Sequence, residues 1–366
     1  MNKLKYLLII LISILSSSIV YGENLNLSSQ SSILMESKSG RILFENNAYK
    51  KLPMASTTKI MTALIALERG RLDDDVQVHI DSVGVEGSSI YLKDKEVMKL
   101  EDLLYGLMLQ SGNDAAVAIA IHIGGTVEEF VAYMNKRAEE LGAINTNFTN
   151  PHGLHCSNHY TTAYDLALIS REALANEDFA KIVNTKSYSS KRDENNYFYN
   201  KNKTLWDYMG GDGVKIGYTM SSGRCLVSSA TRNNMKIIAV SLNGQDWFRD
   251  NYKLLDYGFE NFKMYLLYDK GQFVEKIALG EGDRQFADLL TEECLYYPLK
   301  DGERENIKIS TDIPKTLKLP IDEGEKVGSI STYLNGRLLA RDNLTSKYPI
   351  RKTNIIVRLF QKIRGK

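Results

Sequence analysis

Apolar residues recur with the period of one helix face through much of the first half of the chain. On this pattern, helices are predicted at residues 57–69, 103–108, 116–123, 126–141 and 162–175. Gly70 is suited to end the first of them, because glycine readily follows a last helical turn. Thr126 and Thr162 each precede an acidic residue by three positions, which is typical of a capped helix N-terminus. This part of the chain is therefore expected to be mainly helical.

Alternating apolar and polar residues mark strands on either side of this helical region. Strands are predicted at residues 32–35, 41–44, 225–231 and 235–242, and a closing helix at 248–259. The first pair flanks a turn at Gly40, and the second pair flanks Arg232-Asn233-Asn234. Strands at both ends with helices between them indicate one antiparallel sheet flanked by helices, an α/β (α+β) fold.

Beyond Met264 the pattern changes to short apolar stretches separated by turns, at 273–279, 307–310 and 326–333. This pattern is typical of a small all-β domain, and it contains no catalytic constellation. Its expected role is to hold the first domain at a set height above a membrane. The 366-residue length and 43% hydrophobic content suit two domains with substantial cores.

The N-terminus has the features of a secretory signal. Lys3 and Lys5 precede an apolar run at 7–15, and Val20-Tyr21-Gly22 is an acceptable cleavage site. An uncleaved anchor is the alternative. The expected organisation is a signal peptide at 1–22, the sheet domain at 23–262, the β-rich domain at 263–346 and a tail at 347–366. We thus expect an exported protein at the outer face of the cytoplasmic membrane or in the cell wall.

The tail at 347–366 carries seven basic residues and no acid. Its apolar residues fall on one helical arc, with Arg358, Lys362 and Arg364 off that arc. This is the pattern of an amphipathic helix at a membrane surface. A disordered basic tail, or a last helix packed on the domain, is the alternative.

Candidate chemistry begins at Ser56-Thr57-Thr58-Lys59, at the start of a predicted helix. A serine and a lysine three positions apart point the same way on a helix, so the amine can take the hydroxyl proton. The lysine can act as a base only when its amine is neutral, and burial and a second nearby cation both lower a lysine pKa. The alternative is an ordinary helix start, with Ser56 as a cap and Lys59 in solvent.

Two more polar motifs follow, Ser111-Gly112-Asn113 between two helices and Lys215-Ile216-Gly217 before a strand. The first could simply cap the second helix, a role that Asp114 can also fill. The second could be an ordinary strand with one solvated lysine. The order S-x-x-K, S-x-N and K-x-G is that of penicillin-interacting serine enzymes.

The residues around these motifs strengthen that similarity. The segments 53–59, 150–154, 160–169 and 211–219 resemble the D-alanyl-D-alanine carboxypeptidases, the low-molecular-weight penicillin-binding proteins of peptidase family S11. The resemblance is close over about residues 30–260 and looser beyond. It implies a β-lactamase/transpeptidase-like fold and an enzyme that removes the terminal D-alanine from peptidoglycan stem pentapeptides, in cell-wall biogenesis. It implies no cofactor, and β-lactams as covalent inhibitors.

Each motif residue then has an expected role. Ser56 is the nucleophile, Lys59 the base, and Ser111 relays a proton to the leaving amine. Substrate-binding residues are expected to be Asn113 for an amide, Lys215 for the carboxylate, Gly217 for close backbone approach, and Tyr218, whose N–H would join that of Ser56 in an oxyanion hole. The resemblance adds Arg249 as a second carboxylate binder, for which a surface arginine is the alternative. His152 and Asp165 are interpreted mainly as loop scaffolding.

One position departs from the family pattern, because Ile216 stands where the third motif usually has threonine. Loss of a hydrogen bond to a carboxylate costs about 1.5 to 3 kcal/mol. Thr219 or Arg249 could compensate. We therefore expect a weaker affinity for penicillins rather than loss of activity.

Composition restricts the partners. Removal of residues 1–22 takes the formal charge from +1 to −1, which argues against a nucleic-acid partner. The three cysteines, Cys156, Cys225 and Cys294, show no C-x-x-C pairing and predict neither a disulfide framework nor a cysteine-only zinc site. His152, His155, Cys156 and His159 could be interpreted as a metal site, but no second ligand pair has matching spacing.

Two other functions remain as alternatives. One is a serine β-lactamase on the same fold, although the region between Ser111 and Lys215 offers no clear deacylating glutamate in an omega loop. The other is a non-catalytic module that binds peptidoglycan. Ser56, Lys59, Ser111 and Asn113 argue against that module, and Ile216 argues weakly for it.

Overall fold

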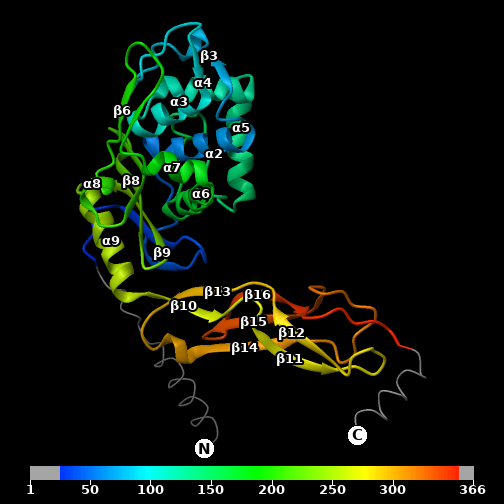
Figure 1. Cartoon of the computed structure of the whole chain (residues 1–366). Coiled ribbons are helices and arrows are strands. Elements are labelled where there is room, and N and C mark those ends of the chain that lie inside the picture. Colours follow the sequence, from blue (N-terminus) through cyan, green and yellow to red (C-terminus); the bar gives the residue numbers. More distant parts are fainter. Residues whose placement is uncertain (1–24, 354–366) are drawn as a thin grey trace, which may run out of the picture.

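The computed structural model describes residues 25–353. Figure 1 shows a helix-rich domain at the top and an elongated, all-β region below it. The upper domain is built on an antiparallel sheet of five described strands in the order β2-β1-β9-β8-β7. These strands are β1 (Ser31–Glu36), β2 (Ile42–Asn46), β7 (Gly211–Thr219), β8 (Gly223–Arg232) and β9 (Met235–Gly244). The two ends of the domain's chain meet at the pairing of β1 with β9, which confirms the single predicted sheet.

Alternate residues of a strand point to opposite faces of the sheet, and here both faces carry apolar side chains. Helices therefore cover both faces. Ile33 and Met35 of β1 belong to the large core beneath most of the helices, while Leu34 between them belongs to a second core. In that second core, Leu254 and Leu255 of α9 (Trp247–Asn261) pack on the sheet. The strand β7 lies at the edge of the sheet and packs against the 3-10 turn η1 (Ala55–Thr58).

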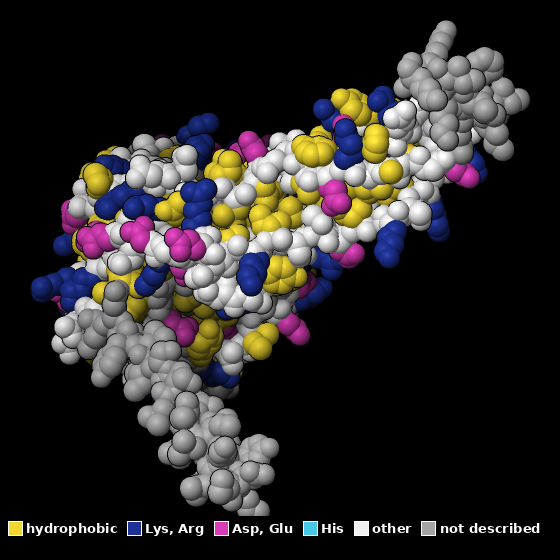
Figure 2. Space-filling view, turned by 90° about the horizontal axis from the view of Figure 1, so that it is seen from below, with side chains coloured by type: hydrophobic (Ala, Val, Ile, Leu, Met, Phe, Trp, Pro, Cys, Tyr) yellow, Lys and Arg dark blue, Asp and Glu magenta, His cyan; other side chains and the backbone are white. Residues whose placement is uncertain are grey.

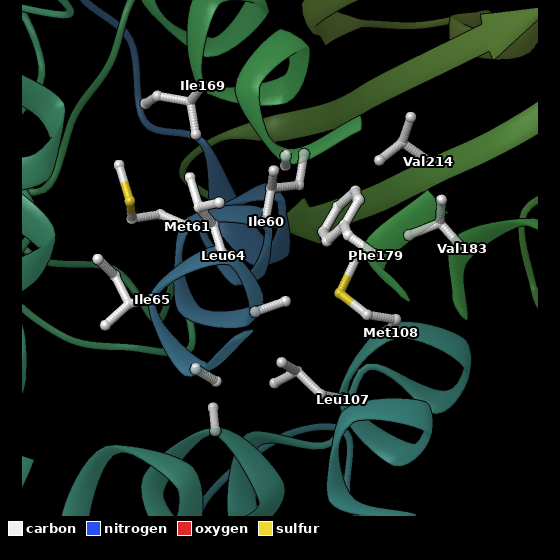
Figure 3. Packing of buried hydrophobic residues seen from close by; sticks show 14 of the residues in the cluster. Ile60, Met61, Leu64, Ile65, Leu107, Met108, Ile169, Phe179, Val183 and Val214 are labelled. Carbon is white, nitrogen blue, oxygen red and sulfur yellow. The ribbon is translucent and has the colours of Figure 1, made fainter. Parts of the chain in front are cut away.

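The helices of the large core surround α2 (Lys59–Arg69), which lies at its centre. In Figure 3, Ile60 and Leu64 of α2 lie among Leu107, Ile169 and Phe179 from neighbouring helices. The other helical elements are α3 (Leu100–Tyr105), the π-helical turn η3 (Gly106–Gln110), α4 (Asn113–Gly124), α5 (Val127–Glu140), α6 (Ala163–Ala175), α7 (Glu177–Asn184), α8 (Thr204–Asp207) and the short 3-10 turn η2 (Ile80–Ser82). Two small two-stranded sheets complete the domain: β3 (Asp75–Gln77) with β4 (Val97–Lys99), and β5 (Ser187–Ser189) with β6 (Tyr197–Tyr199).

Most of the predicted elements are confirmed, with differences at their ends. Thr126 and Thr162 accept hydrogen bonds from Glu129 N and Asp165 N at 3.1 and 3.0 Å and so cap α5 and α6. Gly70 follows α2, as predicted. The predicted helix at 57–69 begins as a 3-10 turn, and the helix at 103–108 changes to π geometry before Ser111. Helix α7 and the hairpin β5–β6 were not predicted, because neither segment has a long periodic pattern.

The lower region is all β, as predicted, and consists of two antiparallel sheets in the described chain. Strands β10 (Lys263–Tyr268) and β13 (Leu295–Leu299) form one of them. The other has the order β11-β12-β16-β15-β14, and its strands are β11 (Phe273–Ala278), β12 (Phe286–Thr291), β14 (Ile307–Asp312), β15 (Lys326–Leu334) and β16 (Arg337–Ser346). A separate core holds it together, with Leu289, Ile330 and Leu344 fully or almost fully buried. The short turn η4 (Glu303–Asn306) lies between β13 and β14.

The two regions are joined by an arginine at the β1–β2 hairpin. The Arg41 guanidinium donates to both carboxylate oxygens of Glu303, at 2.6 and 2.9 Å, and to Pro298 O at 2.6 Å. Its plane also lies over the rings of Phe262 and Tyr297. An arginine that donates two hydrogen bonds to a carboxylate and lies over aromatic rings contributes both charge pairing and packing at an interface. The joint therefore attaches the lower region to the β2 edge of the upper sheet.

The predicted tail begins too early. Ile350 is fully buried in the core of the lower region and pairs with Ile321, and Lys352 pairs with Gly282. Residues 347–353 thus extend the β-rich region, and the predicted amphipathic stretch from residue 354 lies outside the described residues, as does the predicted signal peptide at 1–22.

Across residues 25–353, no single helix has the length and apolar character needed to cross a membrane. Only the pair α4 and α5, bent by 86° at its break, meets those criteria when taken together.

Candidate active site

The candidate nucleophile stands on a turn that is held in place by its own side chains. Thr57 Oγ1 donates to Met54 O at 2.6 Å and Thr58 Oγ1 to Ala55 O at 2.8 Å, which tightens the turn ahead of α2. Lys59 follows at the first position of α2, and its Nζ donates to Ser56 Oγ at 3.0 Å. The i, i+3 spacing therefore places an amine in direct contact with the hydroxyl, as the S-x-x-K pattern predicts.

Lys59 has no exposed surface and no carboxylate within ion-pair distance among the described residues. Its other two hydrogen bonds go to neutral oxygens, Asn113 Oδ1 at 2.6 Å and His152 O at 2.7 Å. Burial lowers the pKa of Lys59 well below its ordinary value, and the charge of Lys215 lowers it further, while Asp114 acts in the opposite direction. The alternative of a solvated lysine at an ordinary helix start is therefore wrong.

Asn113 is held by the backbone of a neighbouring loop. Its Nδ2 donates to Glu86 O at 2.5 Å and its backbone N to Ser88 O at 2.7 Å. Because the amide nitrogen is occupied in this way, the amide oxygen faces Lys59. The Ser-x-Asn motif and the S-x-x-K motif thus meet through a side-chain hydrogen bond.

Asp114 satisfies one N–H group in the first turn of α4, because its Oδ1 accepts from Ala115 N at 2.9 Å, a role that was open from the sequence. The position before the helix is Gly112, which has no side chain to cap it. The buried Asp114 carboxylate also accepts from Ser89 Oγ at 2.5 Å and from Ile90 N and Leu92 N at 3.0 and 3.1 Å. This residue fixes the loop that in turn holds Asn113, a role for which the sequence gives no local signal.

Ser111 lies directly after the π turn η3 in a left-handed conformation, with φ of 64°. A serine seldom adopts this conformation, and strained backbone of this kind clusters at active sites. Ser111 is 7% exposed, and its hydroxyl makes no hydrogen bond to any residue in the 25–353 range. The structure therefore does not link Ser111 directly to Ser56 or Lys59.

The third motif lies on the edge strand β7 beside η1. At Gly217, a Cβ atom would lie 2.9 Å from Ser56 N and 3.0 Å from Thr57 N, so only glycine allows this close approach. Lys215 is 2% exposed, and its Nζ donates to Ile216 O at 3.1 Å. Burial and then the charge of Lys201 lower the pKa of Lys215 to about 7. Tyr218, next along the strand, is 61% exposed.

The loop that contains the histidines completes the wall around Lys59. His159 Nδ1 accepts from Thr149 N at 3.0 Å, which puts the ring proton on Nε2, 2.8 Å from Thr58 Oγ1. Burial lowers the pKa of His152 to about 3 and that of His159 to about 4, so both rings are neutral. Within residues 25–353, no three His, Cys, Asp or Glu side chains are grouped to hold a metal ion. The Asp165 carboxylate accepts from Asn145 N and Thr146 Oγ1, as expected of scaffolding.

Comparison with known proteins identifies this arrangement. A family model described as D-alanyl-D-alanine carboxypeptidase, peptidase S11, matches residues 19–246. The chain belongs to peptidase family S11. A second model, described as the C-terminal domain of penicillin-binding protein 5, matches residues 262–352. The resemblance inferred from the motifs is thereby confirmed, and the chain is a hydrolase of the peptidase class.

Individual S11 relatives match along almost the whole chain. The D-alanyl-D-alanine carboxypeptidase DacF of Bacillus subtilis is 35% identical over 338 residues, 89% of this chain and 87% of the relative. DacA of Haemophilus influenzae is 31% identical over 351 residues, 91% of this chain and 88% of the relative. The crystal structure of penicillin binding protein 5 from Haemophilus influenzae superposes with a TM-score of 0.75 at 31% identity, covering 89% of this chain and 98% of that one. The expected transpeptidase-like fold is therefore confirmed.

In this S11 chain Arg249 lies apart from the three motifs, whereas His152 contacts one of them. Arg249 lies in the first turn of α9 with a 73% exposed side chain, and it faces Asp246 at 4.0 Å. Within residues 25–353, the Arg249 side chain makes no hydrogen bond or ion pair with the three motifs. His152, in contrast, contributes a backbone oxygen to Lys59, which sequence reasoning missed because the contact does not depend on the side chain.

Proposed function

We propose that this S11 chain is a serine D-Ala-D-Ala carboxypeptidase that acts through an acyl ester on Ser56. The observation that supports this most strongly is the 3.0 Å contact between Ser56 Oγ and the fully buried Lys59 amine. Burial lowers the pKa of Lys59 well below its ordinary value, which favours the neutral amine that can accept the Ser56 proton. Ser56 Oγ then attacks the carbonyl carbon between the last two D-alanines.

The remaining steps follow from the same groups. The C–N bond breaks as the leaving D-alanine amine takes a proton, and Ser111 is the proposed relay for that proton. Water then attacks the ester, Ser56 recovers its proton, and the shortened stem peptide is released. The backbone N–H groups of Ser56 and Tyr218 are the proposed oxyanion donors, since Gly217 brings β7 against η1.

Substrate recognition is proposed to use the edge of the sheet. The stem peptide adds along β7, and Asn113 aligns one of its amides. Lys215 attracts the terminal carboxylate, with Arg249 as a second binder in the same role. β-Lactams mimic the substrate and acylate Ser56 without rapid release.

The two alternatives are weaker on specific grounds. A non-catalytic scaffold has no need for a fully buried lysine in contact with a serine hydroxyl, because burying an ammonium costs free energy. A β-lactamase is less favoured because the family match is to the carboxypeptidases over most of the first domain.

We further propose that the enzyme is exported and works on peptidoglycan at the outer face of the cytoplasmic membrane, anchored by its tail. The described chain ends at Thr353, in the β-rich region on the side away from the helices (Figure 1). The test is binding of the mature chain and of a variant lacking residues 354–366 to anionic vesicles at low and high salt. Equal partition of both proteins would contradict the anchor.

The enzymatic proposal is tested by intact mass spectrometry after incubation with benzylpenicillin. One adduct is expected on wild type, on the peptide that contains Ser56, and none on Ser56→Ala. Ser187→Ala, at an exposed position on β5, is the matched control and should be labelled normally. Release of D-alanine from a peptide ending in D-Ala-D-Ala should follow the same pattern. An adduct on another residue, or labelling of Ser56→Ala, would refute the mechanism.

A further inference from the structure

A third lysine lies next to the motif lysines, on the segment between β6 and α8. Lys201 is flanked by two asparagines that are each 2% exposed. Asn200 Nδ2 donates to Val183 O at 3.2 Å and Thr185 O at 3.0 Å, and Asn202 Oδ1 accepts from Thr204 N at 3.1 Å. Two buried amides therefore hold the backbone of Lys201 rigidly on both sides.

The side chain of Lys201 reaches the backbone beside the Ser-x-Asn motif. Its Nζ donates to Gln110 O at 3.4 Å, and Gln110 directly precedes Ser111. Partial burial lowers the pKa of Lys201, and its charge acts on Lys215. The charge of Lys201 thus acts on Lys215, and the charge of Lys215 acts in turn on Lys59, which contacts Ser56 Oγ.

Few acidic side chains act on Lys59, Lys201 and Lys215. Among the described residues, none of the three lysines forms an ion pair. Only one acid in this range, Asp114, raises the pKa of any of them, and it acts on Lys59. The one hydrogen bond of Lys215 within this range goes to the carbonyl of its own neighbour, Ile216. A buried ammonium has three donors, so Lys215 keeps donors for a ligand. A site of this kind favours an anion.

We propose that Lys201 and Lys215 together form the subsite for the terminal carboxylate of the substrate, which makes Lys201 a specificity-determining residue. A carboxylate has two oxygens, and the two lysines can each donate to one of them. This chain has Ile216 in place of a hydroxyl at the third motif, and Lys201 supplies a donor that the isoleucine lacks. The inference rests on the proposed function of Lys215 and adds a residue that no motif contains.

The test compares an acid with its neutral derivative. Second-order rates of Ser56 acylation are measured by intact mass for benzylpenicillin and for its methyl ester, with wild type, Lys201→Gln and Lys201→Arg. Loss of a charge-assisted hydrogen bond at a partly exposed site should slow acylation by the acid about tenfold in Lys201→Gln. Acylation by the ester should be unchanged, and Lys201→Arg should restore most of the rate with the acid.

Lys203→Gln is the matched control, since Lys203 is an exposed lysine two positions away. Its rates with both compounds should equal those of wild type. If Lys201→Gln slows the acid and the ester equally, or slows neither, Lys201 does not recognise the carboxylate and the inference is wrong. If wild type is not acylated on Ser56 by either compound, the proposed function itself fails, and the inference fails with it.

Discussion

Both regions of this molecule carry exposed ion pairs, but within residues 25–353 only the upper domain buries lysines that have no ion-pair partner. In the upper domain, Lys59 and Lys215 are 0% and 2% exposed, and neither has an ion-pair partner in the described chain. In the lower region, charges lie on the surface and are paired, as in Arg341 with Asp312 at 3.1 Å and Arg351 with Asp322 at 2.6 Å. Figure 2 shows this region from below, with hydrophobic side chains along its length and Lys and Arg at its edges.

The difference distinguishes buried, unpaired lysines at the candidate site from exposed, paired charges on the surface. An unpaired buried ammonium destabilises the fold, so its presence indicates a site where reactivity is required. Exposed ion pairs contribute little to stability and are tolerant of change. Substitutions in the two regions should therefore differ by orders of magnitude in their effect on acylation.

The largest effect is expected for Lys59→Met, which removes the base and keeps a similar side-chain length. Acylation by benzylpenicillin should fall by roughly a thousandfold or more, because the hydroxyl then has no base in contact. The far-ultraviolet circular dichroism spectrum should match wild type. Labelling within threefold of the wild-type rate would remove Lys59 from the mechanism.

The next effect is on the pH dependence of stability, through Lys215. Its pKa is lowered to about 7 in the folded protein, against an ordinary value of 10.5. Between these two values the unfolded chain binds a proton that folded Lys215 does not hold, so the free energy of unfolding rises with pH. Below pH 7 Lys215 is protonated in both the folded and the unfolded chain. It then contributes nothing to the pH dependence of the free energy of unfolding.

We therefore expect wild type to gain stability from about pH 7 to 9 relative to Lys215→Met, which cannot titrate. Urea unfolding of the two proteins at each pH measures this difference. Arg341→Met serves as the control because the guanidinium stays charged throughout this range. Parallel pH curves for wild type and Lys215→Met would contradict the lowered pKa.

A smaller effect is expected for Ile216→Thr, which restores the hydroxyl of the usual third motif. Acylation by penicillin should become about tenfold faster, because the hydroxyl adds a hydrogen bond to the carboxylate. The gain should be smaller if Lys201, Thr219 or Arg249 already satisfies that group. An unchanged rate in a folded variant would show that carboxylate recognition does not use this position.

The smallest effect is expected in the lower region. Arg341→Ala removes an exposed ion pair, in which the side chains of Arg341 and Asp312 are 58% and 80% exposed. It should change the free energy of unfolding by less than about 1 kcal/mol and leave acylation unchanged. A loss of activity in this variant would mean that charge in the lower region does contribute to the site.

The sequence was sufficient for features that depend on local spacing. The i, i+3 relation places Ser56 beside Lys59, and period-2 alternation predicts β1, β8 and β9. Features that depend on distant contacts were not predicted. The Asp114 carboxylate binds a loop more than twenty residues earlier in the chain, and the His152 carbonyl reaches Lys59 from a segment that no helical or strand pattern positions.

The position of the joint has a consequence for the size of substrate that the enzyme can take. Arg41 attaches the lower region at the β1–β2 turn, next to the edge strand β2, whereas Gly217 and Lys215 lie on β7 at the other edge. Four strand spacings separate these edges, about 19 Å. The lower region therefore does not stand in front of β7, and a peptide still attached to a long polymer can approach that strand from the side. The sheet acts as a spacer that leaves room for a substrate much larger than the enzyme.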